Sequence, residues 1–208
     1  ELRVVFMAII GLTGGIASGK STASRYLKDL GASVVDADLL GHKVYEPNTP
    51  GFEKIVNTFG HDLVSDDGTI DRRILGGKVF GSPEQMDLLT SIAWPEIRRM
   101  AEEEFLEINE KDPNQSIIFE AAVLIEAGWQ DMVDEVWVVT TKIDTAIDRL
   151  EVRNGLSRSD ALKRIESQMS NKERIEYADV KLDNSEDEEK LRSRVEYHWK
   201  RFLKRTSN

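Results

Sequence analysis

The chain lacks cysteine, has little histidine and contains no apolar run long enough to cross a membrane. Its 208 residues include Cys 0 and His 3, which excludes disulfides, thiol catalysis and cysteine-ligated metal. No stretch approaches the roughly 18 apolar residues of a transmembrane helix, so we expect no integral membrane segment. The apolar run at 4–10 leads straight into a glycine loop, unlike a secretory signal. These absences agree with a reducing compartment and predict a cytoplasmic protein.

An excess of positive charge is also missing. The chain carries 28 Lys and Arg against 38 Asp and Glu, a formal net charge of −10, so we expect no nucleic-acid partner. Hydrophobic residues at 40% and charged residues at 32% describe an ordinary globular protein, and the length suits one domain. A bound anion would need cations gathered locally against the overall charge. The composition does not indicate an oligomeric state.

A glycine-rich segment at 14–22 is the strongest motif of the chain. It fits G-x-x-x-x-G-K-[ST], the phosphate loop of nucleotide-binding folds. An apolar, β-branched run precedes it and a helical apolar pattern at 23–30 follows, which is the order that a phosphate loop requires. Its glycines turn backbone N–H groups toward a bound triphosphate, Lys20 reaches the outer phosphates, and Ser21 binds the accompanying Mg²⁺. The predicted triphosphate contacts are Gly14, Gly15, Ile16, Ala17, Ser18, Gly19, Lys20, Ser21 and Thr22.

Short apolar strands alternate with helical patterns along the chain. This alternation is typical of a parallel, doubly wound α/β sheet. Two helices are expected to meet at Trp94-Pro95, because proline interrupts the helical hydrogen-bond ladder, and the second is expected to run from Glu96. The predicted strands lie at 4–10, 32–35, 116–120, 136–139 and 178–184.

Acidic residues follow two of these strands. Asp36 and Asp38 come after the strand at 32–35, and Glu120 ends the strand at 116–120. The carboxyl ends of parallel strands form the active crevice of open α/β sheets, so at least one of the two aspartates is expected to be functional. The alternative is a helix cap, for which Asp is well suited; we expect this, or a supporting role, for Asp36. Glu120 and Glu126 receive no assigned role, and a place near the metal is left open for both.

A cluster of cations begins at Arg149. Arg149, Arg153 and further basic residues up to Arg164 surround a turn at Asn154-Gly155. Such a segment would suit a lid that closes over phosphates and excludes water. The alternative is a helix with exposed ion pairs, because acidic partners are interspersed. The pair Arg72-Arg73 is either an anion contact or solvated surface.

Two classes of phosphate-loop protein can be compared with these motifs. A switch GTPase also requires D-x-x-G and N-K-x-D; residues 38–41 formally supply the first, but Arg174 stands where the carboxylate of the second must be. A small-molecule kinase needs Mg·ATP on the loop, an acid that accepts the proton of the acceptor hydroxyl, and cations around the transferring group. The residues favour the kinase.

The segments at 11–22, 35–38, 67–73 and 178–184 resemble the dephospho-CoA kinase family, over about residues 9–185. The segments at 92–95 and 121–129 look more like the kinase domain of the animal bifunctional CoA synthase. The chain is therefore expected to be either a eukaryotic-type enzyme or a domain excised from a longer protein.

The resemblance implies a P-loop NTPase kinase fold with a five-stranded sheet, in a single domain over 1–208. It also implies a helical, CoA-side insertion at about 55–112 and a helical lid at about 149–172. The implied reaction is ATP-dependent phosphorylation of the ribose 3′-hydroxyl of dephospho-CoA, with Mg²⁺ as cofactor.

Family motifs assign roles to individual residues. Asp38 matches the catalytic acid, and Lys20 and Arg149 also count as catalytic. Arg153 falls in the lid, and Arg174 and Asn184 match positions near the ATP base and lid. The predicted ATP contacts beyond the loop are Arg149 and Asn184, and the predicted acceptor contacts are Asp38, Arg72, Arg73 and Trp94. Another nucleoside or nucleotide kinase, and an ATP-dependent binding module, remain the alternatives.

Overall fold

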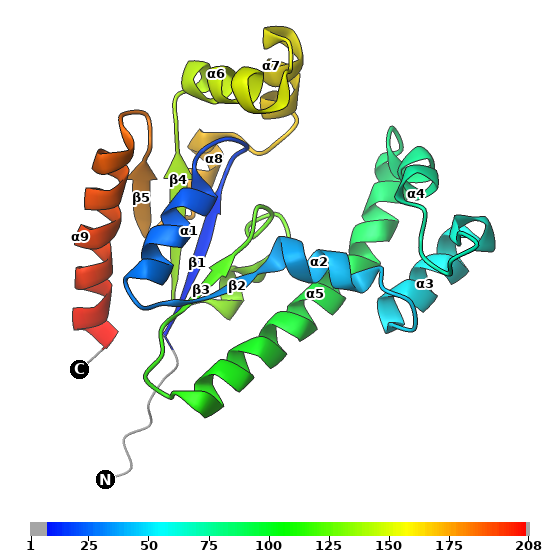
Figure 1. Cartoon of the computed structure of the whole chain (residues 1–208), viewed down its shortest axis with the longest axis horizontal. Helices are drawn as coiled ribbons and strands as arrows, with labels where there is room; N and C mark the ends of the chain where they lie inside the picture. Colours follow the sequence, from blue (N-terminus) through cyan, green and yellow to red (C-terminus); the bar gives the residue numbers. More distant parts are fainter. Residues whose placement is uncertain (1–7, 207–208) are drawn as a thin grey trace. The chain divides into compact units, whose positions relative to one another are not determined.

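The computed structural model describes residues 8–206. It divides the chain into two compact units (Figure 1). The first unit consists of the described residues up to Val35 and from Glu107 onward, and the second consists of Asp36–Leu106. No helix of the described residues is long and apolar enough to span a membrane.

A five-stranded sheet in the order β2-β3-β1-β4-β5 forms the centre of the first unit. The pairs β1–β3, β1–β4 and β4–β5 are parallel, so the predicted α/β class and doubly wound sheet are confirmed. Each predicted strand overlaps a strand of the sheet. The first extends to Gly14, and its predicted residues 4–7 lie outside the described residues. The strands are β1 (Ile9–Gly14), β2 (Ser33–Asp36), β3 (Ile117–Glu120), β4 (Glu135–Thr140) and β5 (Val180–Asp183).

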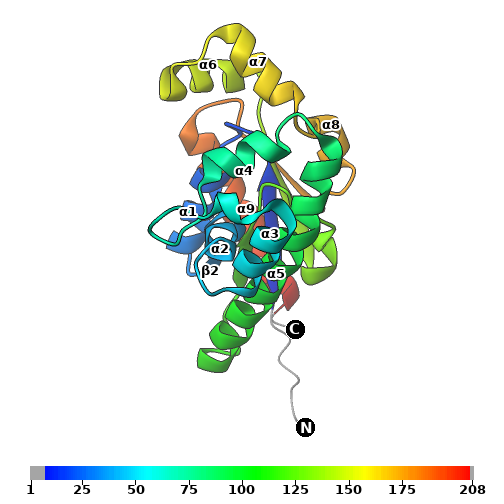
Figure 2. The ribbon, with the colours of Figure 1, turned by 90° about the vertical axis from the view of Figure 1, so that its right-hand side faces the viewer.

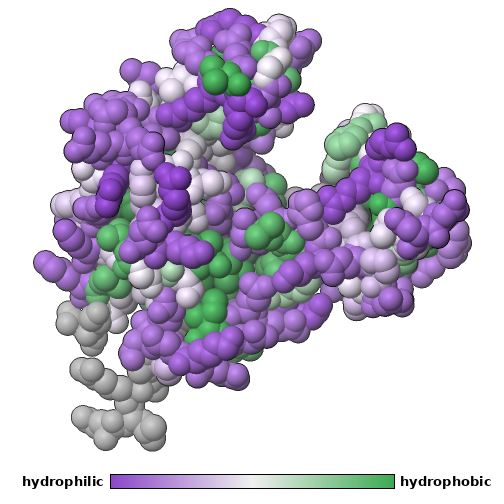
Figure 3. Space-filling model, viewed as in Figure 1, coloured by the Kyte–Doolittle hydropathy of each residue, from purple (hydrophilic) through white to green (hydrophobic). Residues whose placement is uncertain are grey.

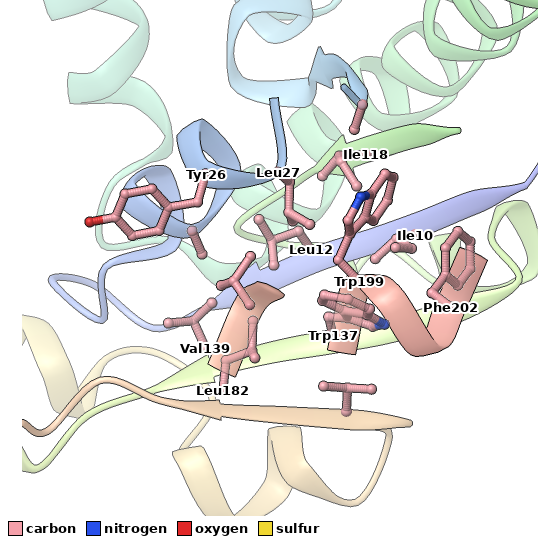
Figure 4. Packing of buried hydrophobic residues seen from close by; sticks show 14 of the residues in the cluster. Ile10, Leu12, Tyr26, Leu27, Ile118, Trp137, Val139, Leu182, Trp199 and Phe202 are labelled. Carbon is pink, nitrogen blue, oxygen red and sulfur yellow. The ribbon is translucent and has the colours of Figure 1, made fainter. Parts of the chain in front are cut away.

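Helices α1 (Lys20–Asp29) and α9 (Glu188–Thr206) pack on the sheet and form a hydrophobic core with it. Figure 4 shows Leu12 and Trp137 of the sheet in one cluster with Leu27 of α1 and Phe202 of α9. Burying a side chain of this size contributes about 1.5–3 kcal/mol. The last helix turns one apolar stripe toward this core, because all its members are buried: Leu191, Val195, Trp199 and Phe202.

A helical hairpin follows β4. Its two helices are α6 (Ile143–Asn154) and α7 (Arg158–Glu166), and they lie side by side at the top of Figures 1 and 2. Gly155, with φ 63°, ends α6 in the left-handed conformation that glycine favours. Figure 3 shows mostly hydrophilic side chains over the hairpin.

Two short helical elements complete the first unit. The chain returns through α8 (Asn171–Ile175) to β5, and η2 (Trp129–Met132) precedes β4.

The second unit is helical. Helix α3 (Pro50–Phe59) begins with a side-chain cap: the Thr49 hydroxyl accepts the Phe52 N–H at 3.1 Å, and proline occupies the first position. Turns and short helices occupy residues 60–81. The remaining elements are α2 (Ala37–Val44), η1 (His61–Leu63), α4 (Arg72–Val79) and α5 (Pro83–Lys111), the last of which continues into the first unit.

The predicted break at Trp94-Pro95 is wrong, because α5 runs without interruption through Pro95. An internal proline costs a helix about 3 kcal/mol, since it lacks an N–H and clashes with the preceding turn. Apolar side chains on both sides of Pro95 nevertheless belong to one buried stripe, which includes Leu89, Ala93 and Ile97. Only a continuous helix keeps that stripe in phase. Packing therefore outweighs the local preference of proline.

Candidate nucleotide site

The phosphate loop, residues 14–22, connects β1 to α1 as predicted. Gly14 and Gly19 are required there because neighbouring atoms leave no room for a side chain. A Cβ on Gly14 would lie 2.6 Å from the Val139 carbonyl oxygen, and one on Gly19 would lie 2.0 Å from the Asn184 side-chain nitrogen. Gly19 also has φ 97°, where other residues are strained. The sequence pattern is therefore backed by a backbone that only glycine fits.

Arg149 and Asn184 reach the loop from distant parts of the chain. The Asn184 amide donates to the Ser18 carbonyl oxygen at 2.8 Å, and Arg149 donates to the Ala17 carbonyl oxygen at 3.0 Å. Arg149 also donates to the Asn184 carbonyl oxygen at 3.0 Å. Asn184 is buried. The structure thus brings these predicted ATP contacts together with the loop, and it shows that both hold the loop backbone.

Lys20, Ser21 and Glu120 form a polar cluster where the loop enters α1. Lys20 Nζ lies 3.1 Å from Glu120 Oε1, and the Ser21 hydroxyl donates to the same oxygen at 3.2 Å. The exposed fractions of the Lys20 and Glu120 side chains are only 12% and 7%. A charge pair this well shielded from water interacts more strongly than a surface pair, but its desolvation is costly. A phosphate would give Lys20 a second anionic partner.

The same cluster has the chemistry of a Mg²⁺ site. This ion binds oxygen, and in nucleotide enzymes it takes one or two protein ligands and fills its other positions with phosphate oxygens and water. The Ser21 hydroxyl and the Glu120 carboxylate supply such oxygens. Among residues 8–206 no group of three or more His, Cys, Asp or Glu side chains could hold a metal. The Ser21 and Glu120 oxygens fit an ion whose other ligands are phosphate oxygens and water.

A cavity of about 540 Å³ lies beside the loop. Its wall includes loop residues, the α6 side chains Arg149, Val152 and Arg153, and Asn184 with Glu188 beyond β5. The volume is ample for a nucleoside. The exposed fraction of Val152 is 89%, so a large apolar surface is available to a flat ring.

The predicted cation cluster on the hairpin divides into two groups. Arg149 bonds to the loop, and Arg153 lines the cavity with only the neighbouring Asn154 amide as a partner among the described residues. Arg158 instead pairs with Asp144 and lies 3.7 Å from Asp148. The alternative interpretation of this segment, exposed ion pairs, therefore applies to Arg158 and not to Arg149 or Arg153.

Arg174 is buried in the scaffold, although sequence motifs place it near the ATP base or lid. It donates to the Glu126 carboxylate at 3.0 Å and to the Ala122 carbonyl oxygen at 3.2 Å, and its side chain is 2% exposed. A third bond, to the Met169 carbonyl oxygen, anchors the segment that returns from α7. Glu126 thus neutralises a buried arginine.

Asp36 and Asp38 lie at the start of α2 in the second unit. Asp36 caps the helix, because its carboxylate accepts the Asp38 N–H at 2.8 Å and the Leu39 N–H at 3.3 Å. This is the role expected for Asp36. Asp38 occupies the first turn, is exposed, and follows the end of β2 by two positions.

The other predicted acceptor contacts also belong to the second unit. Arg72 lies 3.2 Å from the His42 ring nitrogen and stacks over Tyr45. Arg73 is largely exposed beside Asp71, and Trp94 is half-buried on α5. Asp71 caps α4, and the Arg73 and Ile74 N–H groups lower the pKa of its carboxyl.

Two polar residues at the loop received no role from the sequence. Glu120 carried a signal, since it is an acid at the end of a strand, but its partner could not be identified. Gln168 carried none, and its side-chain oxygen accepts the Ile16 N–H at 2.9 Å. This contact joins residues far apart in the sequence, and only the fold shows it.

Comparisons with known proteins place the chain in a family. A family model described as Dephospho-CoA kinase matches residues 8–189. The chain is 39% identical to the dephospho-CoA kinase of Carboxydothermus hydrogenoformans, covering 97% of this chain and 100% of the relative. It is 44% identical to that of Geobacter sulfurreducens, covering 94% and 100%. The likeness to the animal bifunctional enzyme stays a prediction.

Solved structures agree with this assignment. TT1252 from Thermus thermophilus matches with a TM-score of 0.77 and 30% identity, covering 94% of this chain and 97% of the other. The dephospho-CoA kinase from Campylobacter jejuni matches with a TM-score of 0.62 and 26% identity over the same shares. The predicted P-loop kinase fold and family are confirmed: this chain belongs to the dephospho-CoA kinase family.

Proposed function

We propose that this protein transfers the terminal phosphoryl group of ATP to the ribose 3′-hydroxyl of dephospho-CoA, giving CoA and ADP. Membership of the family along nearly the whole chain supports this reaction. The observation that carries it is the phosphate loop with Lys20, Ser21 and Glu120 clustered at its end. We also propose that the enzyme acts in the cytoplasm.

The loop residues bind the phosphates of ATP. Backbone N–H groups of the loop and the N-terminus of α1 face the anion, and Lys20 pairs with the outer phosphates. These groups are held before the nucleotide arrives, by the contacts of Arg149 and Asn184 with the loop backbone. Donors that need no reorganisation stabilise developing charge most effectively.

Ser21 and Glu120 are the residues that would hold Mg²⁺. The ion, when bound, neutralises negative charge on the phosphate oxygens. The chain itself supplies the Ser21 hydroxyl and the Glu120 carboxylate, and Glu120 keeps Lys20 close to the phosphates.

Asp38 is the proposed base. Its carboxylate accepts the proton of the ribose 3′-hydroxyl as the oxygen attacks the terminal phosphorus. Asp36 fixes the first turn of α2 and so orients Asp38. Arg72, Arg73 and Trp94 are the proposed acceptor contacts, within a helical CoA-side region at about 55–112.

The hairpin of α6 and α7 is the proposed lid, within about residues 149–172. Arg149 and Arg153 face the cavity beside the loop. Their guanidinium groups would neutralise phosphate charge, and closure of the hairpin would exclude water from the transferred group. Asn184 is proposed to border the ATP base.

An assay of ADP release tests this function. Dephospho-CoA, nucleosides and nucleotides are supplied separately as acceptors with Mg·ATP. The proposal expects turnover with dephospho-CoA at a rate well above that with every other acceptor. Preferred turnover of a nucleoside or nucleotide would replace the proposed acceptor, and ATP binding without turnover would favour a binding module.

A further inference from the structure

A hydrogen bond connects the end of the α6–α7 hairpin to the phosphate loop. Gln168 follows α7, and its side-chain oxygen accepts the Ile16 N–H at 2.9 Å. Only the oxygen of an amide can accept, so the contact fixes the orientation of the Gln168 side chain. The Gln168 N–H itself donates to the Ile165 carbonyl oxygen at 3.2 Å, which ties the residue to the last turn of α7.

The residue after Ile16 has an unusual backbone conformation. Ala17 has φ 57°, in the left-handed region that residues other than glycine rarely occupy. Such a conformation persists only where surrounding contacts impose it. Here the contacts come from both arms of the hairpin: Gln168 holds the Ile16 N–H, and Arg149 of α6 holds the Ala17 carbonyl oxygen at 3.0 Å.

The two bonds enclose a single peptide group of the loop. The Ile16 N–H belongs to the peptide group before the Ile16–Ala17 bond, and the Ala17 carbonyl belongs to the one after it. Both neighbours of the intervening group are therefore fixed, and that group carries the Ala17 N–H. In a phosphate loop such N–H groups form the cradle for the phosphates.

The segment that carries Gln168 is well anchored. The Asn171 side chain donates to the Thr141 carbonyl oxygen at 2.9 Å, and buried Arg174 donates to the Met169 carbonyl oxygen at 3.3 Å. A Cβ on Gly15 would lie 3.8 Å from the side-chain oxygens of both Gln168 and Asn171. The backbone around Gln168 is thus anchored independently of Ile16, and it places the Gln168 side-chain amide over the loop.

We infer that Gln168 is a positioning residue for ATP: by accepting the Ile16 N–H it holds the loop in its phosphate-binding conformation and couples it to the lid. The inference rests on the proposed function, since it assumes that the loop binds the phosphoryl donor. Without Gln168 the loop would have to be ordered by ATP itself, and that ordering would reduce affinity. The chemical steps and the acceptor site would be unaffected.

The test compares Gln168→Met, which keeps length and flexibility but has no oxygen acceptor, with Gln168→Glu, which keeps the acceptor. The matched control is Glu166→Met, an exposed residue of α7 near Gln168. Loss of one hydrogen bond corresponds to a change of about fivefold. Gln168→Met should therefore raise the KM for ATP and the Kd for an ATP analogue by about fivefold. Its kcat and its KM for dephospho-CoA should change by less than about twofold.

Hydrogen exchange of the Ile16 amide supplies a readout that does not depend on activity. In the nucleotide-free protein this amide should exchange faster in Gln168→Met than in wild type, and it should stay protected in Gln168→Glu and Glu166→Met. An unchanged KM for ATP in Gln168→Met, or unchanged exchange at Ile16, would overturn the inference. A Gln168→Met variant that loses both kcat and thermal stability along with ATP affinity would also overturn it, because such losses indicate a general structural role. If wild type fails to phosphorylate dephospho-CoA, the proposed function fails while analogue binding and exchange still test Gln168.

Discussion

Replacing Glu120 by glutamine should weaken the folded state measurably before any nucleotide is added. Glu120 is the shared partner of Lys20 and Ser21, at 3.1 and 3.2 Å, and all but 7% of its side chain is shielded from water. At an effective dielectric constant of about 20, the Coulomb attraction of a pair at this distance is about 5 kcal/mol. Desolvation of the two charges offsets much of that attraction.

The loss of stability in Glu120→Gln depends on which contacts glutamine can still make. Removing one partner of a buried pair costs about 3–5 kcal/mol, because the other charge is left uncompensated. Glutamine still offers an oxygen to Lys20 and Ser21, so we expect about 2 kcal/mol. For a chain of this length that lowers the thermal midpoint by about 4–8 °C.

Thermal unfolding of the nucleotide-free protein measures this effect. The matched control is Glu103→Gln, which removes an exposed pair with Arg99 at 2.6 Å and should cost less than about 1 kcal/mol. A midpoint for Glu120→Gln equal to that of the control would refute the role assigned to the buried pair.

Three further changes give distinct results. Asp38→Asn should lower turnover by about a hundredfold or more and leave ATP affinity nearly intact, because it removes only the base; ADP release and calorimetry measure both, and unchanged turnover would remove Asp38 from the mechanism. Gly19→Ala should abolish detectable nucleotide binding, since its Cβ would lie 2.0 Å from the Asn184 amide at φ 97°; normal affinity would contradict the loop geometry. Asp183→Asn should make stability less sensitive to acid. The Ser185 hydroxyl lowers the pKa of Asp183, so its contribution is present above the ordinary pKa of about 3.9 and is lost as pH falls through the lower folded value. Parallel acid-unfolding curves for wild type and variant would argue against that contribution.

Local patterns in the sequence predict most of the fold. The strands of a parallel sheet are short apolar runs, and the helix after the loop shows its buried face through Ala23 and Leu27. Such signals depend on neighbouring residues only. These local signals fail at Pro95. Proline alone favours a helix break there, but burial of apolar residues on both sides of it stabilises a continuous helix.

The parts of the candidate site that lie in sequence motifs could be predicted from the sequence. The loop, Lys20 and Ser21 follow from residue spacing, and Arg149 and Asn184 follow from family motifs. The bonds of Glu120 and Gln168 do not, since they join residues distant in sequence whose approach is set by strand order and by the return of the chain through α8. The buried position of Arg174 is likewise a property of packing, because nothing in its local sequence distinguishes it from a surface arginine.

We expect ATP bound on the loop to phosphorylate dephospho-CoA. The most direct measurement is the position and amount of phosphate in the product formed by the wild-type protein, by mass spectrometry and ³¹P NMR, with Lys20→Ala as control. We predict one CoA, phosphorylated at the ribose 3′-position, for each ADP released, and at most a small residual rate in Lys20→Ala. ADP release without CoA, or a fully active Lys20→Ala variant, would contradict the claim.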